Sequence, residues 1–231
     1  MQSVHDISQL EQTIGYSFRN HQLMVTALSH SSYVNEKRIR RYEDNERLEF
    51  LGDAILEMIS SEFLYATYPD MDEGELTKLR ASLVCEPALA HCAREISLEE
   101  YLLLGKGEEA TGGRKRDSII SDALEALIGA IYLDGGFTSA KEFILKCVLS
   151  DVENQKFFYD SKTILQEMIQ KDSEQLLHYE ILDEKGPDHN KVFTAAAIVG
   201  ERILGKGEGR TKKAAEQKAA YASIMALKQE Q

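Results

Sequence analysis

The sequence lacks several features that mark whole classes of protein. Its 231 residues include no tryptophan, three prolines and three cysteines. The cysteines, Cys85, Cys92 and Cys147, are odd in number and lack the spacing of a zinc site, so we expect reduced thiols rather than a disulfide scaffold. No apolar run approaches the ~18 residues that a membrane span needs, so we expect no membrane partner.

Two motifs are also missing. The first residues lack the charged-then-apolar pattern of a secretory signal, which favours a cytoplasmic protein. The glycine-rich stretch from Gly105 to Gly113 lacks the Gly-x-x-x-x-Gly-Lys-Ser/Thr pattern of a nucleotide P-loop. We therefore expect this stretch to be a loop that does not bind a nucleotide in the P-loop manner.

The chain has no overall excess of basic residues. Its net charge is −12, of which residues 1–157 carry −11 and residues 158–231 carry −1. The acidity therefore belongs to the first part of the chain. Because lysines that cluster locally can bind phosphates even in an acidic chain, this balance does not exclude a nucleic-acid partner.

Residues 43–63 predict one long helix with a buried face. Its apolar residues recur at steps of three and four, which is the spacing of an amphipathic helix. We expect the following side chains to be buried: Leu48, Leu51, Ile55, Met58 and Ile59.

Four acidic residues lie on the opposite side of this helix. Glu46, Glu49, Asp53 and Glu57 fall within roughly 80° of one another in a helical projection. A solvated face usually mixes charges of both signs, whereas four carboxylates repel one another. A divalent cation is the candidate that would offset this repulsion. An acidic surface without a ligand is the alternative interpretation.

Residues 117–134 predict a second informative helix. Asp122 and Glu125 are three residues apart and so are neighbours on one side of it. Ala126 and Gly129 lie beside Asp122, where their small size would let another helix or a ligand approach closely. We expect Gly135 and Gly136 to end the helix.

The two helices therefore offer two close acidic pairs, Glu49 with Asp53 and Asp122 with Glu125. If the pairs face each other, four carboxylates converge and can hold Mg²⁺ or Mn²⁺, which prefer hard oxygen ligands. Such a cation can activate water and stabilise a leaving phosphate oxygen. Glycosidases also use two carboxylates, but they do not need four on paired helices.

The pattern changes after a polar segment at residues 153–160, which we expect to be a linker. Before it, residues 1–152 show no convincing strand and predict an all-α domain. After it, residues 161–229 predict a small α+β domain in the order α-β-β-β-α. The expected strands are 178–183, 191–199 and 202–206, between helices at 162–171 and 211–228.

These motifs resemble a known family. The stretch from Asn45 to Ala54 resembles the signature of ribonuclease III, and the resemblance extends to residues 72–74, 79–81, 104–108 and 121–134. The tail resembles a double-stranded RNA-binding domain at residues 162–167, 186–189 and 207–217. The match follows the family's order over nearly the whole chain.

The resemblance implies a homodimeric, Mg²⁺-dependent endonuclease, with Mn²⁺ as a possible substitute. It would cut both strands of duplex RNA to give 5′-phosphate and 3′-hydroxyl ends, in ribosomal RNA precursors and other structured transcripts. By the same resemblance Glu49, Asp53, Asp122 and Glu125 are metal ligands, and Asp53 and Glu125 are catalytic.

Four further positions match the family. Glu46, Glu73 and Glu108 correspond to acidic positions near its catalytic valley, although each has a surface carboxylate as the alternative. Phe50 corresponds to a residue at the dimer interface, with a contact inside the monomer core as the alternative.

The tail has its own physical logic as an RNA-binding surface. Duplex RNA hides its base edges, so proteins bind its shape, its 2′-hydroxyls and its phosphates. For the minor grooves the sequence offers Thr163, Gln166, Glu167, Gln170 and His189. Lys212 and Lys213 begin a helix, where the helix dipole also favours phosphate.

Two other function classes compete with a nuclease. The first is a duplex-RNA-binding protein whose helical part only dimerises, and the presence of all four acids argues against it. The second is a metal-dependent phosphohydrolase acting on small molecules, and the RNA-binding tail argues against that.

Overall fold

The computed structural model describes residues 7–38, 43–150, 152, 161–172, 176–186, 191–209 and 211–229. The chain divides into two compact units, Met1–Val152 and Glu153–Gln231, which are described separately below. The predicted linker at 153–160 and the predicted RNA contact His189 lie outside the described residues.

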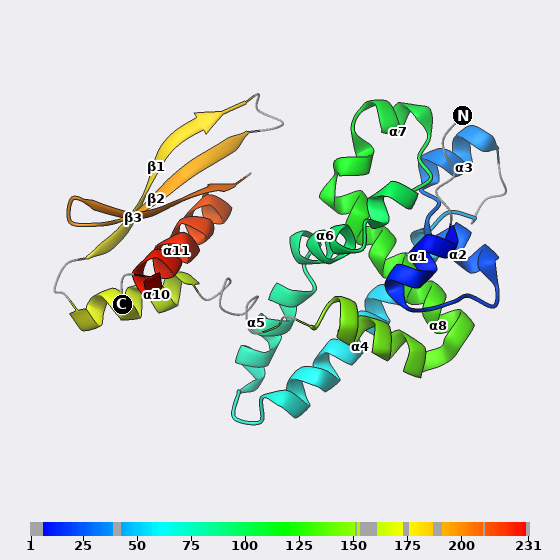
Figure 1. Cartoon of the computed structure of the whole chain (residues 1–231), viewed down its shortest axis with the longest axis horizontal. Coiled ribbons are helices and arrows are strands. Elements are labelled where there is room, and N and C mark those ends of the chain that lie inside the picture. Colours follow the sequence, from blue (N-terminus) through cyan, green and yellow to red (C-terminus); the bar gives the residue numbers. More distant parts are fainter. Residues whose placement is uncertain are drawn as a thin grey trace. The chain divides into compact units, whose positions relative to one another are not determined.

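The first unit is built from helices, as the sequence predicts (Figure 1). Among its described residues the one extended pairing outside the helices is an isolated bridge between Ser29 and Leu103. The elements are α1 (Ile7–Ile14), α2 (His21–Ala27), α3 (Ser31–Lys37), α4 (Glu46–Thr67), α5 (Glu73–Leu83), α6 (Glu86–Glu95), the 3₁₀ turn η1 (Leu98–Tyr101), α7 (Lys106–Ala110), the 3₁₀ turn η2 (Gly113–Lys115) and α8 (Asp117–Cys147).

The core of this unit surrounds α4 and α8, the two helices that carry the acidic pairs. The prediction that Met58 lies on the buried face of α4 is wrong, because its side chain is 51% exposed. Gly52 and Leu56 are buried in its place, because α4 contacts α8 at Gly52 and this contact rotates the buried face. Glu49, one turn before Gly52, is thereby carried towards α8.

Two glycine-rich segments behave differently from each other. The segment after Gly105 is not the loop that the sequence predicts, because Lys106–Ala110 form the short helix α7 and Gly113–Lys115 the turn η2. At Gly136 the backbone leaves the helical region, with φ 79° and ψ −174°, and the helix resumes up to Cys147. A glycine accepts this positive φ without strain, so Gly136 supplies the expected break.

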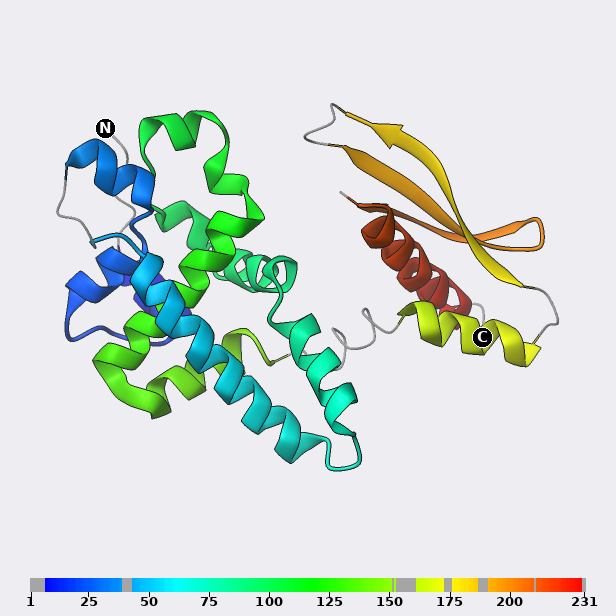
Figure 2. The ribbon, with the colours of Figure 1, turned by 180° about the vertical axis from the view of Figure 1, so that it is seen from behind.

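In its described residues, the second unit consists of a three-stranded antiparallel sheet and two helices (Figure 2). Its elements are α10 (Ser161–Asp172), β1 (Leu177–Lys185), β2 (Val192–Val199), β3 (Arg202–Gly209) and α11 (Lys212–Gln229), with sheet order β1-β2-β3. The helices and one face of the sheet share a core that includes Leu165, Ala195, Ala219 and Ile224. The predicted fold class, all-α followed by α-β-β-β-α, is confirmed.

Alternate glycines let α11 lie directly on β3. A Cβ atom added to Gly205, Gly207 or Gly209 would come within 2.6, 2.3 or 2.6 Å of backbone nitrogens of α11. Real Cβ atoms do not approach this closely, so larger residues at these positions would push the helix away. The close contact fixes where α11 begins, and therefore where Lys212 and Lys213 are displayed.

In the described part of the chain, no helix combines the length and hydrophobicity that crossing a bilayer requires.

Candidate metal centre and nucleic-acid interface

Contact between two helix backbones positions the acidic residues of the first unit. A Cβ atom added to Gly52 of α4 would lie 1.8 Å from the carbonyl oxygen of Glu125 in α8. One added to Gly129 of α8 would lie 2.3 Å from the carbonyl oxygen of Leu48 in α4. Only glycine permits helices to approach this closely. Because Glu49 is one turn from Gly52 and Glu125 is one turn from Gly129, their side chains meet beside the crossing.

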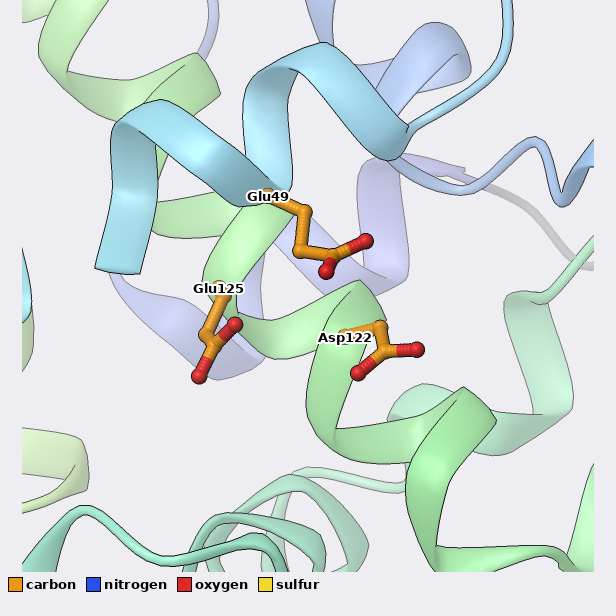
Figure 3. Close-up of side chains that lie close together, drawn as sticks. All are labelled: Glu49, Asp122 and Glu125. Carbon is orange, nitrogen blue, oxygen red and sulfur yellow. The ribbon is translucent and has the colours of Figure 1, made fainter. Parts of the chain in front are cut away.

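Three of the predicted metal ligands come together at this crossing. Glu49, Asp122 and Glu125 each offer one carboxylate oxygen, and these three oxygens lie within 4.8 Å of one another. Figure 3 shows the three side chains directed into one shared space, Glu49 from α4 and the other two from α8. All three are half-buried, so the cluster is open to solvent on one side.

Burial and mutual repulsion raise the pKa of these carboxyls. Desolvation, followed by the charges of Asp53, Asp122 and Glu49, raises the pKa of Glu125 to about 8. Desolvation also raises the pKa of Glu49, with further contributions from Asp122, Glu46 and Asp53. Carboxyls whose pKa is raised by burial and by neighbouring charges are candidates for a functional site. A cation among them would favour the ionised forms.

Asp122 has two neighbours that the sequence did not single out. Burial first, and then the charge of Glu86 at the start of α6, raise the pKa of Asp122. His30 and a hydrogen bond from Ser121 act in the opposite direction. The His30 ring is itself held by α3, because its Nδ1 accepts from the backbone N–H of Ser32 at 3.2 Å. Glu86 and His30 are distant in sequence, so no local spacing could have predicted them.

The remaining acidic candidates are placed differently. Asp53 is exposed and acts on Glu49 and Glu125 through its charge, but it is not part of the group of three. Its role as a fourth ligand therefore stays a prediction. Glu46 is exposed near Glu49, and Glu73 is the exposed first residue of α5. Glu108 pairs with Arg116, at 2.8 Å, immediately before α8.

Phe50 is on the surface of this unit and not in its core. Its side chain is 81% exposed, and it borders a hollow of about 640 Å³. The surface of the hollow is mainly apolar. Eight residues line it: Leu23, Thr26, Glu46, Arg47, Leu48, Phe50, Leu51 and Leu133. A monomer core contact, the alternative left open by the sequence, is therefore wrong.

The second unit displays its predicted RNA-binding residues. The exposed side of α10 carries Thr163, Gln166, Glu167 and Gln170, while Leu165 between them is buried. Lys212 and Lys213 are exposed at the first two positions of α11. The side chains that the sequence predicts to contact RNA are thus available to a ligand on the described helices.

Matches to known families cover both units. Residues 20–152 match the family described as "Ribonuclease-III-like", and residues 161–227 match the "Double-stranded RNA binding motif". The chain is 50% identical over 221 residues to Ribonuclease 3 of Bacillus licheniformis, covering 95% of this chain and 89% of that protein. It is 49% identical over 222 residues to Ribonuclease 3 of Geobacillus kaustophilus, covering 95% and 90%.

The first unit also resembles a solved nuclease domain. The nuclease domain of ribonuclease III from Campylobacter jejuni superimposes with a TM-score of 0.59 at 41% sequence identity. The similarity covers 63% of this chain and 98% of that domain. The Campylobacter domain is described as structurally flexible in a region involved in its dimer formation.

A helical domain with convergent carboxylates, joined to a double-stranded RNA-binding motif, defines a nuclease that acts on duplex RNA. The chain belongs to the ribonuclease III family. It is an endoribonuclease, and the family is metal-dependent.

Proposed function

We propose that this enzyme hydrolyses both strands of duplex RNA with Mg²⁺ bound by Glu49, Asp122 and Glu125, with Asp53 completing the carboxylate cluster. The observation that supports this most strongly is the approach of three carboxylate oxygens to within 4.8 Å on crossing helices. Mn²⁺, which has the same preference for oxygen ligands, is the expected substitute.

The donor set fits a small divalent cation. Every donor is a carboxylate oxygen, and neither sulfur nor imidazole belongs to the group, so the chemistry favours Mg²⁺ or Mn²⁺ over zinc. When bound, such a cation acts as a Lewis acid that helps to generate a nucleophile from water and offsets the charge of the reacting phosphate.

The protein's own residues then have separate tasks. Burial, followed by the charges of Asp53, Asp122 and Glu49, raises the pKa of Glu125 to about 8, and we assign this residue the critical role. The charge of Asp53 acts on Glu125, which supports assigning Asp53 as the second catalytic group. A water oxygen attacks phosphorus, the bond to the 3′ oxygen breaks, and that oxygen takes up a proton. The products are a 5′-phosphate and a 3′-hydroxyl.

The second unit supplies the grip on the duplex. We assign minor-groove contacts to Thr163, Gln166, Glu167 and Gln170, together with His189, and phosphate contacts to Lys212 and Lys213. The exposure of both helix faces supports this assignment for the residues that the structure describes. Because such contacts follow A-form shape and not base sequence, long structured transcripts such as ribosomal RNA precursors are the expected substrates.

We propose a homodimer as the working form. An antiparallel duplex presents two strands related by approximate twofold symmetry, and a C₂ dimer presents two matching clusters. The exposed ring of Phe50 borders a largely apolar hollow, and this pairing of a projecting ring with a hollow on one surface supports a twofold interface. An exposed apolar patch of this kind is a feature of association sites.

We place this activity in the cytoplasm. Cys85, Cys92 and Cys147, which all lie in the described part of the chain, form no disulfide, as is usual for thiols in that compartment.

The test is incubation of the purified protein with long duplex RNA, with Mg²⁺ and with a chelator in its place. We expect cleavage of both strands only with the cation, and product ends that a 5′-phosphate-dependent exonuclease degrades. Single-stranded RNA of the same sequence is the control substrate. Cleavage that persists in the chelator, or that prefers the single strand, would contradict the proposal.

A further inference from the structure

One acidic residue of the second unit occupies the proposed phosphate-binding surface. Glu184, near the end of β1, lies opposite Phe193 of β2 in the sheet register. Facing residues on adjacent strands project to the same side of the sheet. Phe193 packs against the core shared with α11, so Glu184 is directed towards the helix that begins at Lys212.

Each carboxylate oxygen of Glu184 has a lysine of its own. Nζ of Lys212 lies 3.5 Å from Oε1, and Nζ of Lys191 lies 3.6 Å from Oε2. The same Lys212 ammonium lies 5.7 Å from the centre of the Phe193 ring, within the range of a cation–π contact. The ammonium group of Lys212 is thus held by two facing residues, Glu184 through an ion pair and Phe193 through a cation–π contact.

The neighbouring lysine is not held in this way. Among the described residues, no ion pair involves Lys213, although its side chain is exposed on the same first turn of α11. Of the two lysines proposed to contact phosphate, Lys212 is therefore partly neutralised before RNA arrives, and the described part of the chain shows no such pairing for Lys213.

We propose that Glu184 is an affinity-setting residue of the duplex-binding surface. Its ion pair with Lys212 competes with RNA, because a phosphate must displace the Glu184 carboxylate to bind that lysine. Once bound, the phosphate lies near a negative charge that lowers the affinity further. The inference rests on the proposed contact between Lys212 and phosphate.

The consequence is a moderate affinity for duplex RNA, which suits an enzyme that must release its cleaved product. Exposed ion pairs of this kind correspond to about a two- to fivefold change in an equilibrium constant. Removing the charge of Glu184 should therefore tighten duplex binding by about two- to fivefold. The gain should shrink at high salt, because salt screens exposed charges.

The test is a double-mutant cycle on the full chain, measured as the dissociation constant for duplex RNA in a chelator so that the duplex stays intact. We expect Glu184→Gln to bind more tightly than the wild type, and Lys212→Ala to bind more weakly. In the background of Lys212→Ala, Glu184→Gln should give little or no gain, since the pair is already broken.

A matched control is Glu180→Gln. It makes the same charge change in the same strand, but Glu180 lies between the core residues Tyr179 and Ile181 and so projects to the other face of the sheet. We expect no gain from this variant. An equal gain from it would show a net-charge effect and overturn the proposal.

The remaining outcomes separate the two claims. If Lys212→Ala binds duplex RNA as tightly as the wild type, the proposed phosphate contact of Lys212 is wrong. If Lys212→Ala weakens binding while Glu184→Gln leaves it unchanged or weaker, or if the Glu184→Gln gain persists without Lys212, the phosphate contact stands and the role of Glu184 is wrong.

Discussion

The two units handle charge in opposite ways. In the first, like charges converge in a half-buried site, and burial followed by the charges of neighbouring carboxylates raises the pKa of Glu49 and of Glu125. In the second, exposed charges of both signs lie around the start of α11, where Glu184 of β1 pairs with Lys212 and with Lys191. A bound cation would offset the repulsion among the carboxylates of the first unit. In the second unit, Glu184 offsets the charge of Lys212 until an RNA phosphate displaces it.

This difference shows which kind of contact builds each site. Direct backbone contact through Gly52 and Gly129 fixes the carboxylates, because chemistry requires oxygens held at short distances. The lysines are long, flexible side chains on a helix end, and phosphate binding tolerates that freedom. Substitutions in the carboxylate cluster of the first unit should therefore abolish RNA cleavage, and those at the lysines of the second unit should change the affinity for duplex RNA by small amounts.

The largest expected effect is on catalysis by Glu125→Gln. We expect cleavage of duplex RNA to fall by about 10³-fold or more, equivalent to about 4 kcal/mol of barrier, while binding is kept. Single-turnover cleavage and filter binding measure the two quantities. Glu142→Gln, at an exposed position of the same helix, is the control and should cut normally. Near-normal cleavage by Glu125→Gln would remove the distinction between the units.

The next largest effect is on the helix crossing. Gly52→Ala places a Cβ 1.8 Å from a backbone oxygen, which cannot move cheaply, so we expect a loss of about 3 kcal/mol in the free energy of unfolding and loss of cleavage. Denaturant titration measures the stability. Gly107→Ala, where an added Cβ meets nothing within 4 Å, should be neutral or stabilising. An unchanged stability in Gly52→Ala would mean that the contact does not position the acids.

Phe50→Ala tests the surface beside the cluster. Loss of an exposed aromatic ring from an interface should weaken the dimer by about 2 kcal/mol, or about 30-fold in the dissociation constant. Analytical ultracentrifugation over a concentration series measures this. Tyr65→Ala removes an equally exposed ring about 22 Å further along α4 and should leave the dimer intact. A wild type that is active as a monomer at micromolar concentration refutes the two-site arrangement.

The smallest effect is expected in the second unit. Replacing both Lys212 and Lys213 by Ala should weaken duplex binding by about tenfold and reduce its salt slope by about 2, since each phosphate contact accounts for about 1. Binding measured across a salt series gives both values. Lys206→Ala, exposed on β3 between two glycines that face α11, is the control. A salt slope equal to that of the wild type would exclude phosphate contact by this pair.

Local spacing was enough to predict the two helices that carry the acidic pairs, the pairs themselves, and the helices and strands of the second unit. Glu49 was paired with Asp53, and Asp122 with Glu125, because i,i+3 and i,i+4 positions share a helix face, and small residues indicated a close approach to α8. Their role as metal ligands came from the resemblance to ribonuclease III. The spacing misplaced Met58, since periodicity alone does not show which neighbour a face will meet. It also took Lys106–Ala110 for a loop because of its flanking glycines.

Contacts between distant segments could not be predicted in this way. Glu86 and His30 act on Asp122 from α6 and from the start of α3, and only the tertiary fold brings them there. The pairing of Glu184 with Lys212 joins a strand end to a helix start 28 positions away in the sequence. Each of these depends on packing that is set by the whole unit.

Glu49, Asp122 and Glu125 should form one divalent-cation site, and Mn²⁺ binding measured without RNA examines that site apart from every later step. Carboxyl ligands must lose their protons, so binding should strengthen as the pH rises towards the raised pKa of Glu125, about 8. Followed by electron paramagnetic resonance at pH 8.5, the wild type and Glu142→Gln should remove Mn²⁺ from the free signal at the same concentrations, and Glu125→Gln should bind at least tenfold more weakly. Equal Mn²⁺ binding by Glu125→Gln and the wild type would contradict a shared site.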